Sequence, residues 1–425
     1  MELIILLAIS FAAFLLIAKY KDMGLVYTLI FLIPFRLEII SLNGIGIRIT
    51  DIIAILFFLI WILKILSNKE KKHKIKTILP IIIFLLIVII SFLINAFRFS
   101  SVENSIDLLR FLLAIFTGIA VYSSIQNKKD IFSILIVWIF AATSSSIISI
   151  LSFFFNGNGI STLLEFNNLS VVEFYTLKFS NSIFFEDPNN LATYLIISIF
   201  ITLGIAFSSH VSIKYKYLIL SIQLLGLILT MSRSAYLGGA VAFLIFFLFH
   251  KSKSYSRILI KIIVILSLFP LTFSFYKAID SDVSAMSRYE LWQVGLNMTL
   301  SNPIFGVGIG NSSIVFDQYI NSKLLIPNPH FHNLFLTISS EMGIVGLFAF
   351  TLIFIKYILN WNKYNDVLYM FLSLGLVAYL VQSMGVEYFA SRHFWIFIPL
   401  LIKYKSFLVE GSKSVDVSIS PNTSI

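Results

Sequence analysis

The chain contains no cysteine and few charged residues, and both shortages narrow what it can be. Without cysteine there is no disulfide bond, no thiolate nucleophile and no cysteine-ligated metal site. Charged residues make up only 12% of the 425 residues, whereas roughly 25% is usual in a soluble domain. This composition excludes a soluble globular protein. Membrane topology explains the net charge of +10 better than a nucleic-acid partner, so we expect no nucleic acid to bind.

Long apolar runs take the place of the missing charge. Hydrophobic residues account for 58% of the chain, and many runs are long enough to cross a bilayer as a helix. Backbone polar groups in lipid must be hydrogen-bonded within the protein, which makes helices the economical form for such runs. We predict an all-α polytopic membrane protein with about 12 to 13 transmembrane helices. The expected spans are 2–18, 23–39, 51–67, 78–96, 106–125, 131–155, 188–208, 216–232, 234–250, 258–275, 333–355, 366–386 and 392–404.

The distribution of lysine and arginine predicts the orientation of these spans. One set of connections holds most of the basic residues, including the cluster from Lys64 to Lys76. Positive charge accumulates on the cytoplasmic side, so we expect this set to be cytoplasmic and the N-terminus to be external. The predicted organisation is a transmembrane helical domain over 1–404, with external loops at 156–187 and 276–332, and a cytoplasmic tail at 405–425. The first apolar run lacks the basic start and the cleavage site of a signal peptide.

The main chemical signal is a histidine in the second external loop. His332 is a candidate general base, because a neutral imidazole can take a proton from a sugar hydroxyl as that oxygen attacks an anomeric carbon. Asn333 could orient its ring, and Glu341 follows about two turns further along the next helix. His330 competes for the same role, and the residues alone do not separate the two histidines. The simpler interpretation is a surface histidine without a catalytic role.

Two arginines stand at external span edges, Arg233 and Arg288. A guanidinium holds phosphate oxygens with a planar fork of donors, so the pair could clamp a diphosphate. Alternatively, Arg233 extends to the lipid headgroups. Arg288 is expected to begin an amphipathic helix with Tyr289, Leu291, Trp292, Gly295, Leu296 and Met298 on broadly one face. Such a helix could instead lie on the membrane.

The run from Asn302 to Asn311 contains three glycines, Gly306, Gly308 and Gly310. It superficially resembles a phosphate-binding loop but lacks the Lys-Ser/Thr pair of a P-loop. We interpret it as a tight turn after the amphipathic helix.

Polar residues open the seventh predicted span. Asp187 or Asn189 is expected to cap this helix, with Pro188 tolerated in its first turn. Sugar binding by Glu186, Asp187 or Asn189 is the alternative.

Taken together, the motifs resemble the O-antigen ligase and polymerase superfamily in their order and spacing. The resemblance rests on Arg233 with Leu237, Arg288 with Trp292, Asn302-Pro303 with Gly306-Val307-Gly308, and His332-Asn333 with Glu341 and Gly343. It implies a metal-independent, cofactor-free inverting glycosyltransferase of the GT-C type. The enzyme would lie in the bacterial inner (cytoplasmic) membrane, with its active site on the periplasmic or external face. The implied donor is an undecaprenyl-diphosphate-linked glycan, with His332 as base and Arg233 and Arg288 on the diphosphate.

The acceptor separates the branches of this superfamily. We favour polymerisation of surface-polysaccharide repeat units, as in an O-antigen or capsule polymerase. The alternatives are an O-antigen ligase, which transfers the glycan to lipid A–core or protein, and a flippase or transporter of lipid-linked oligosaccharide. The partners expected from the resemblance are the lipid-linked glycan, membrane lipid and a chain-length regulator protein.

Overall fold

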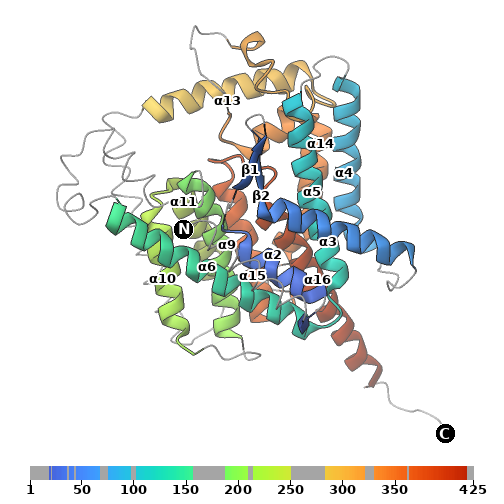
Figure 1. The fold of residues 1–425 in the computed structure, drawn as a ribbon, viewed down its shortest axis with the longest axis vertical. Coiled ribbons are helices and arrows are strands. Elements are labelled where there is room, and N and C mark those ends of the chain that lie inside the picture. Colours follow the sequence, from blue (N-terminus) through green and yellow to red (C-terminus); the bar gives the residue numbers. More distant parts are fainter. Residues whose placement is uncertain are drawn as a thin grey trace.

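The protein is a bundle of helices with a single small hairpin among its described residues (Figure 1). This computed structural model describes residues 19–20, 22–35, 38–42, 45–67, 75–96, 102–156, 187–208, 214–249, 283–320, 330–360 and 363–418. Its helices are α2 (Asp22–Leu32), α3 (Ile49–Leu66), α4 (Ile75–Ala96), α5 (Val102–Ser124), α6 (Lys128–Asn156), α9 (Pro188–Phe207), α10 (Lys216–Leu229), α11 (Arg233–Phe249), α13 (Val283–Ser301), the short η2 (Phe316–Gln318), α14 (Leu334–Leu359), α15 (Val367–Gln382) and α16 (Arg392–Ser418). Strands β1 (Glu38–Leu42) and β2 (Ile45–Arg48) form the antiparallel hairpin.

Six of the described helices are long and apolar enough to cross a membrane: α3, α4, α5, α6, α9 and α14. Their exposed side chains are largely aliphatic. On α4, Leu79, Leu86 and Leu93 recur along one exposed face, the pattern of a helix surface that lies against lipid. Together with the composition, this makes the chain a multi-pass membrane protein.

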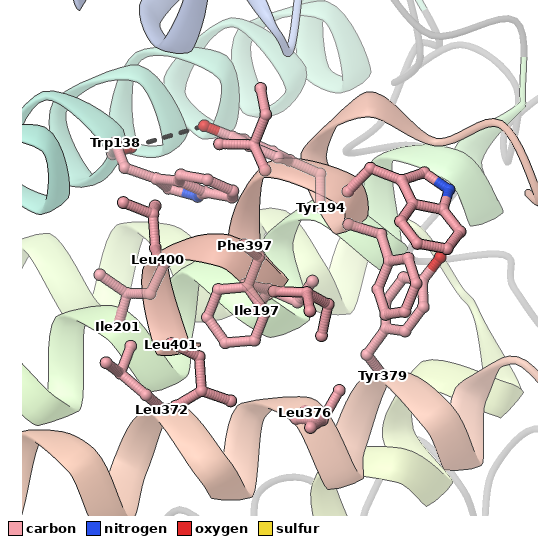
Figure 2. Close-up of a cluster of buried hydrophobic side chains, with 14 of the residues drawn as sticks. Trp138, Tyr194, Ile197, Ile201, Leu372, Leu376, Tyr379, Phe397, Leu400 and Leu401 are labelled. Carbon is pink, nitrogen blue, oxygen red and sulfur yellow. Dashed lines mark hydrogen bonds between the residues drawn. The ribbon is translucent and has the colours of Figure 1, made fainter. Parts of the chain in front are cut away.

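The centre of the bundle is built on α9. Within its most apolar 18-residue stretch, 94% of the residues are buried, because α6, α10, α11 and α15 pack around α9. Close packing of α9 on α15 depends on Gly204, where an added Cβ would come 2.8 Å from Leu368. Figure 2 shows the core between α6, α9, α15 and α16, where Trp138 and Tyr194 stack with ring centroids 5.7 Å apart.

The structure confirms helices at most of the predicted spans and corrects the length of one; six of the described helices are long and apolar enough to cross a membrane. Helices α3, α4, α5, α6, α9, α10, α11, α14 and α15 match the predicted runs closely. The span predicted at 23–39 is wrong in length: α2 ends at Leu32 and the chain then enters the β1–β2 hairpin. The last span extends further than predicted, because α16 continues past residue 404 to Ser418. The predicted spans 2–18 and 258–275, Glu186 and most of the loop 156–187 lie outside the described residues.

The basic residues separate toward two ends of the bundle. We call one of them the lysine end. Helices α3 and α14 end there, and α6, α10 and α15 begin there. It holds lysines 64, 129, 216, 363 and 405. The arginine end is the opposite one, where α3, α9, α11, α14 and α16 begin. An ion pair marks each: Lys64 with Asp22 at the lysine end and Arg392 with Asp51 at the arginine end. Helix α13 packs against α14 and lies across the bundle (Figure 1).

Candidate functional site

Helix α14 is broken at Gly343, and the glycine-rich loop fills the break. Gly343 has φ 69° and ψ −175° inside the helix, which removes the usual partners of nearby backbone groups. The loop supplies replacements: the amides of Val307 and Gly308 donate to the carbonyls of Ser340 and Glu341 at 2.9 and 2.8 Å. In return, the amide of Ile344 donates to the Pro303 carbonyl at 2.8 Å. The loop and the helix therefore form one hydrogen-bonded unit.

This geometry explains the glycines. Gly306 has φ 64°, and an added Cβ would lie 2.3 Å from the Glu341 carbonyl carbon. A Cβ on Gly343 would lie 2.1 Å from the Ile304 carbonyl oxygen. Two backbones meet here at a distance that only glycine permits. Because the Val307 and Gly308 amides are already bonded to α14, the loop serves helix packing, and these amides do not face a phosphate.

We expect Gly343→Ala to lower the free energy of unfolding by at least ~2 kcal/mol, because it combines a strained positive φ with backbone overlap. Thermal unfolding of the detergent-solubilised protein, together with the yield of folded protein, measures this. The matched control is Gly239→Ala on α11, where an added Cβ would come no closer than 3.3 Å, to Ile196 Cδ1, and φ is not positive. A Gly343→Ala protein that unfolds at the wild-type temperature would contradict the packing role.

The loop also fixes α13, which carries Arg288, against the start of α14. The buried face of α13 consists of Leu291, Val294 and Met298, which pack with Phe331 and other residues of a separate hydrophobic cluster. Trp292 Nε1 donates to the Phe331 carbonyl at 2.9 Å. Our predicted amphipathic face was partly wrong, since Tyr289 and Leu296 are 63% and 50% exposed. Arg288 lies in the second turn of α13, which begins at Val283 rather than at the arginine.

His332 sits in a constrained turn just before α14. Its φ is 49°, an uncommon value for a residue with a side chain. Its backbone amide donates to Glu387 Oε2 at 3.1 Å, and the Leu334 amide donates to the Ser383 carbonyl at 2.9 Å. The side-chain oxygen of Asn333 caps α14 by accepting from the Phe335 and Leu336 amides. Asn333 therefore fixes the backbone next to the histidine, and its side-chain oxygen is used in this cap.

Glu387 joins the two histidines and is the residue that the sequence left unassigned. It lies in the connection between α15 and α16, which places it 55 residues from His332 in the chain. Its Oε1 lies 2.6 Å from His330 Nδ1, and its Oε2 accepts from both the His332 amide and Thr337 Oγ1. No local spacing signals such a contact, because it depends on how α14 and α15 pack.

Electrostatics distinguish the two histidines. The hydrogen bond to Glu387 raises the pKa of His330 above its ordinary value, against some opposition from burial. Burial lowers the pKa of His332; Glu387 opposes this shift, whereas Arg288 and His330 reinforce it. His332 is therefore neutral at pH 7 and able to accept a proton, and His330 holds a proton more readily in its pairing with Glu387.

Glu387→Gln is expected to shift the pH dependence of the protein in a defined direction. Removing the negative charge lowers the pKa of His332 further and removes the largest of the factors that raise the pKa of His330. The acid limb of a pH–activity profile should then move to lower pH. In the wild type, the raised pKa of His330 stabilises the folded protein at pH values below the ordinary histidine pKa. That stabilisation is lost as the pH rises through the pKa of His330 in the folded protein. The variant should therefore lose stability mainly below about pH 6.5. An unchanged acid limb would exclude Glu387 as the group that tunes the histidines.

The second arginine stands at the start of α11. Arg233 is its first residue, and the following Ser234 lies directly against Gly385, where an added Cβ would come 2.8 Å from the serine Cβ. Gly385 is two residues before Glu387. The structure thus places Arg233 at the same end of the bundle as His332, and Arg288 close enough for its charge to act on the His332 ring.

Three further candidate residues have structural contacts at this end. Asp187 is the N-cap of α9, as predicted, and accepts from the Asn189 amide at 2.7 Å and from Asn189 Nδ2 at 2.9 Å. Its charge also acts on His332. Glu341 is 5% exposed and accepts from Ser312 Oγ at 2.7 Å, so its carboxylate holds the glycine-rich loop. Within the described ranges, no group of three or more His, Asp or Glu side chains is arranged to hold a metal ion.

Comparison with known proteins finds a similarity over the segment that carries most of the candidate residues. Residues 218–351 match the family model described as O-antigen ligase. The matched segment contains Arg233, Arg288, both histidines and the glycine-rich loop, whereas Asp187 and Glu387 lie outside it. No curated protein matches the chain. The segment from residue 218 to residue 351, which holds the candidate base and both candidate phosphate-binding arginines, is therefore similar to the O-antigen ligase family.

Proposed function

We propose that the protein is an inverting glycosyltransferase that polymerises surface-polysaccharide repeat units from an undecaprenyl-diphosphate-linked oligosaccharide donor. The observation that carries the proposal is the placement of a neutral His332 within reach of the Arg288 charge at one end of the bundle. The family match supports glycan transfer of the ligase or polymerase type. In this proposal, His332 acts on the acceptor side of the reacting anomeric carbon, and the arginines act on the side of the leaving diphosphate.

In the proposed step, His332 takes the proton of an acceptor hydroxyl as its oxygen attacks the anomeric carbon of the donor sugar. The bond between that carbon and the diphosphate oxygen breaks, and undecaprenyl diphosphate leaves with the electron pair. Arg288 and Arg233 stabilise the negative charge that develops on the leaving group. The displacement inverts the anomeric configuration, and it needs no redox partner or covalent enzyme intermediate.

The test is reconstitution with a lipid-linked oligosaccharide, followed by sizing of the products. A ladder of glycans supports polymerisation. Single transfer to lipid A–core or to protein identifies a ligase, the second candidate. Unchanged glycan that moves to the opposite leaflet identifies a flippase and excludes the transfer reaction. For a polymerase, a chain-length regulator is the proposed protein partner, and its addition should narrow the ladder.

We propose further that the arginine end faces the exterior of a bacterial inner membrane, because lysines concentrate at the other end. In this cysteine-free chain, Ser67→Cys at the lysine end and Ser313→Cys in the glycine-rich region provide single labelling sites, and both residues are exposed. On intact spheroplasts a membrane-impermeant thiol reagent should label position 313, and should label position 67 only after permeabilisation. The reverse pattern would overturn the orientation and the location of the active site.

A further inference from the structure

Two glutamines are fully buried in the described part of the bundle, and their side chains are bonded differently. Gln223 on α10 has partners on neighbouring helices: its Oε1 accepts from Thr202 Oγ1 at 2.8 Å, and its Nε2 donates to Thr143 Oγ1 at 3.2 Å. Gln382, the last residue of α15, has no hydrogen-bond partner for either side-chain atom among the residues that the structure describes. A buried amide without partners is costly, because its lost contacts with water are not replaced.

Gln382 lies at the arginine end, on the face of α15 that packs against α9 and α11. On this face, Gly375 lies against Phe200 of α9. Ala378 lies against Gly238 of α11, where an added Cβ would come 2.3 Å from the Ala378 carbonyl oxygen. Gln382 follows Ala378 by one helical turn, and its backbone nitrogen would be 3.2 Å from the same Cβ. The side chain is therefore enclosed near the starts of α9 and α11.

The turn that follows Gln382 contacts both elements that carry the proposed reaction. The Gln382 carbonyl accepts from the Gly385 amide at 2.9 Å, and Gly385 lies against the residue that follows Arg233. The next carbonyl, of Ser383, accepts from the first amide of α14 at 2.9 Å and so fixes the end of the turn that holds His332. Gln382 is thus packed where the donor-side arginine and the proposed base approach each other.

The Gln382 amide is matched by an uncharged group that both donates and accepts hydrogen bonds, because a carboxamide offers N–H donors and an accepting oxygen. The polyprenyl chain of the proposed donor does neither, and its diphosphate only accepts. A sugar hydroxyl or acetamido group does both. The contact with the start of α11 puts Gln382 on the diphosphate side of the site. We infer that Gln382 binds such a group on the sugar linked to the donor diphosphate; this rests on the proposed function and adds a specificity-determining residue to it.

A sugar reaches Gln382 only when the start of α11 separates from the end of α15. The α11 residues that touch Gln382 and Gly385 are Gly238 and Ser234, and both are small. Without the sugar, the closed contact keeps the amide unsatisfied. A sugar that satisfies the amide therefore favours the separated arrangement, by as much as it binds that arrangement more tightly.

The test combines thermal unfolding of the purified full-length protein with its binding of an undecaprenyl-diphosphate-linked oligosaccharide. Gln382→Leu removes the amide and keeps an apolar side chain in its place. Its unliganded form should unfold at or above the wild-type temperature, since no hydrogen bond is lost, and its affinity for the donor should fall on the order of tenfold. Gln223→Leu is the matched control with the opposite result: it should unfold at a lower temperature, because its partners lose their bonds, and should keep the wild-type donor affinity.

Two further ligands locate the contact. Undecaprenyl diphosphate without glycan should bind the wild type and Gln382→Leu equally. Among donors that each lack one hydroxyl or acetamido group of the diphosphate-linked sugar, one should bind the wild type about tenfold less tightly than the parent donor does. Gln382→Leu should bind that donor and the parent equally.

The inference is overturned if Gln382→Leu binds the parent donor as the wild type does, or if it also binds undecaprenyl diphosphate less tightly. A marked fall in its unfolding temperature overturns it too, because the amide is then satisfied inside the protein, for example by a buried water. A wild type that binds the donor with the expected sugar selectivity but transfers no glycan contradicts the proposed function and supports the assignment of Gln382. A wild type that does not bind the donor overturns both.

Discussion

Replacement of His332 by alanine is expected to abolish glycan transfer while donor binding and folding remain. General-base catalysis typically contributes roughly 100- to 10,000-fold to the rate, and His332 is the neutral histidine of the pair because burial lowers its pKa. Its fold contribution comes through the backbone, since the amide binds Glu387 and remains in the variant. The measurement is product formation from a lipid-linked donor, alongside donor binding and thermal unfolding.

His330→Ala is the comparison for this experiment. The His330 side chain is 62% exposed and pairs with Glu387, so its loss should reduce the rate less and should change the pH profile. If His330→Ala is inactive and His332→Ala is active, the base is misassigned but the reaction class survives. If both single variants and the double variant transfer glycan at the wild-type rate, the mechanism is wrong.

Removal of either donor-side arginine is expected to have the second largest effect. A positioned cation that meets charge developing in a transition state is commonly worth on the order of 100-fold or more in rate. We therefore expect Arg288→Ala and Arg233→Ala each to lose at least about that factor. Arg→Lys should recover little, because lysine keeps the charge but loses the fork of donors. Turnover of a lipid-linked donor by correctly inserted variants is the measurement.

The same assay tests independence from metal. Activity should persist in excess chelator if the arginines, rather than a divalent cation, neutralise the diphosphate. Loss of activity in chelator, restored by added magnesium or manganese, would contradict that role. Normal turnover by both alanine variants would show that neither guanidinium binds the leaving group.

Much of the fold was predictable because apolar run length limits where a membrane helix can begin and end. The hairpin was missed for the same reason: Ile33, Phe35, Leu37 and Ile39 extend the apolar run of α2, so the start of the strand was predicted as more helix. The cap at Asp187 was predictable, since capping is local. Glu387 was not, because its contact with the histidines depends on the packing of α14, α15 and α16. The cap at Asn333 was missed although it is also local, because attention went to its position beside His332; its oxygen accepts from the Phe335 and Leu336 amides.

The hydrogen bonds around the break in α14 limit which parts of the candidate site can move. Backbone hydrogen bonds join the loop after α13 to α14 on both sides of Gly343. We therefore expect α13 and α14 to move as one rigid body, without a hinge between them. These contacts, rather than a hinge between α13 and α14, set the spacing of Arg288 and His332. If the proposed reaction holds, we expect the site to open for a lipid-linked sugar elsewhere, at α11 with Arg233 or at the connection that carries Glu387.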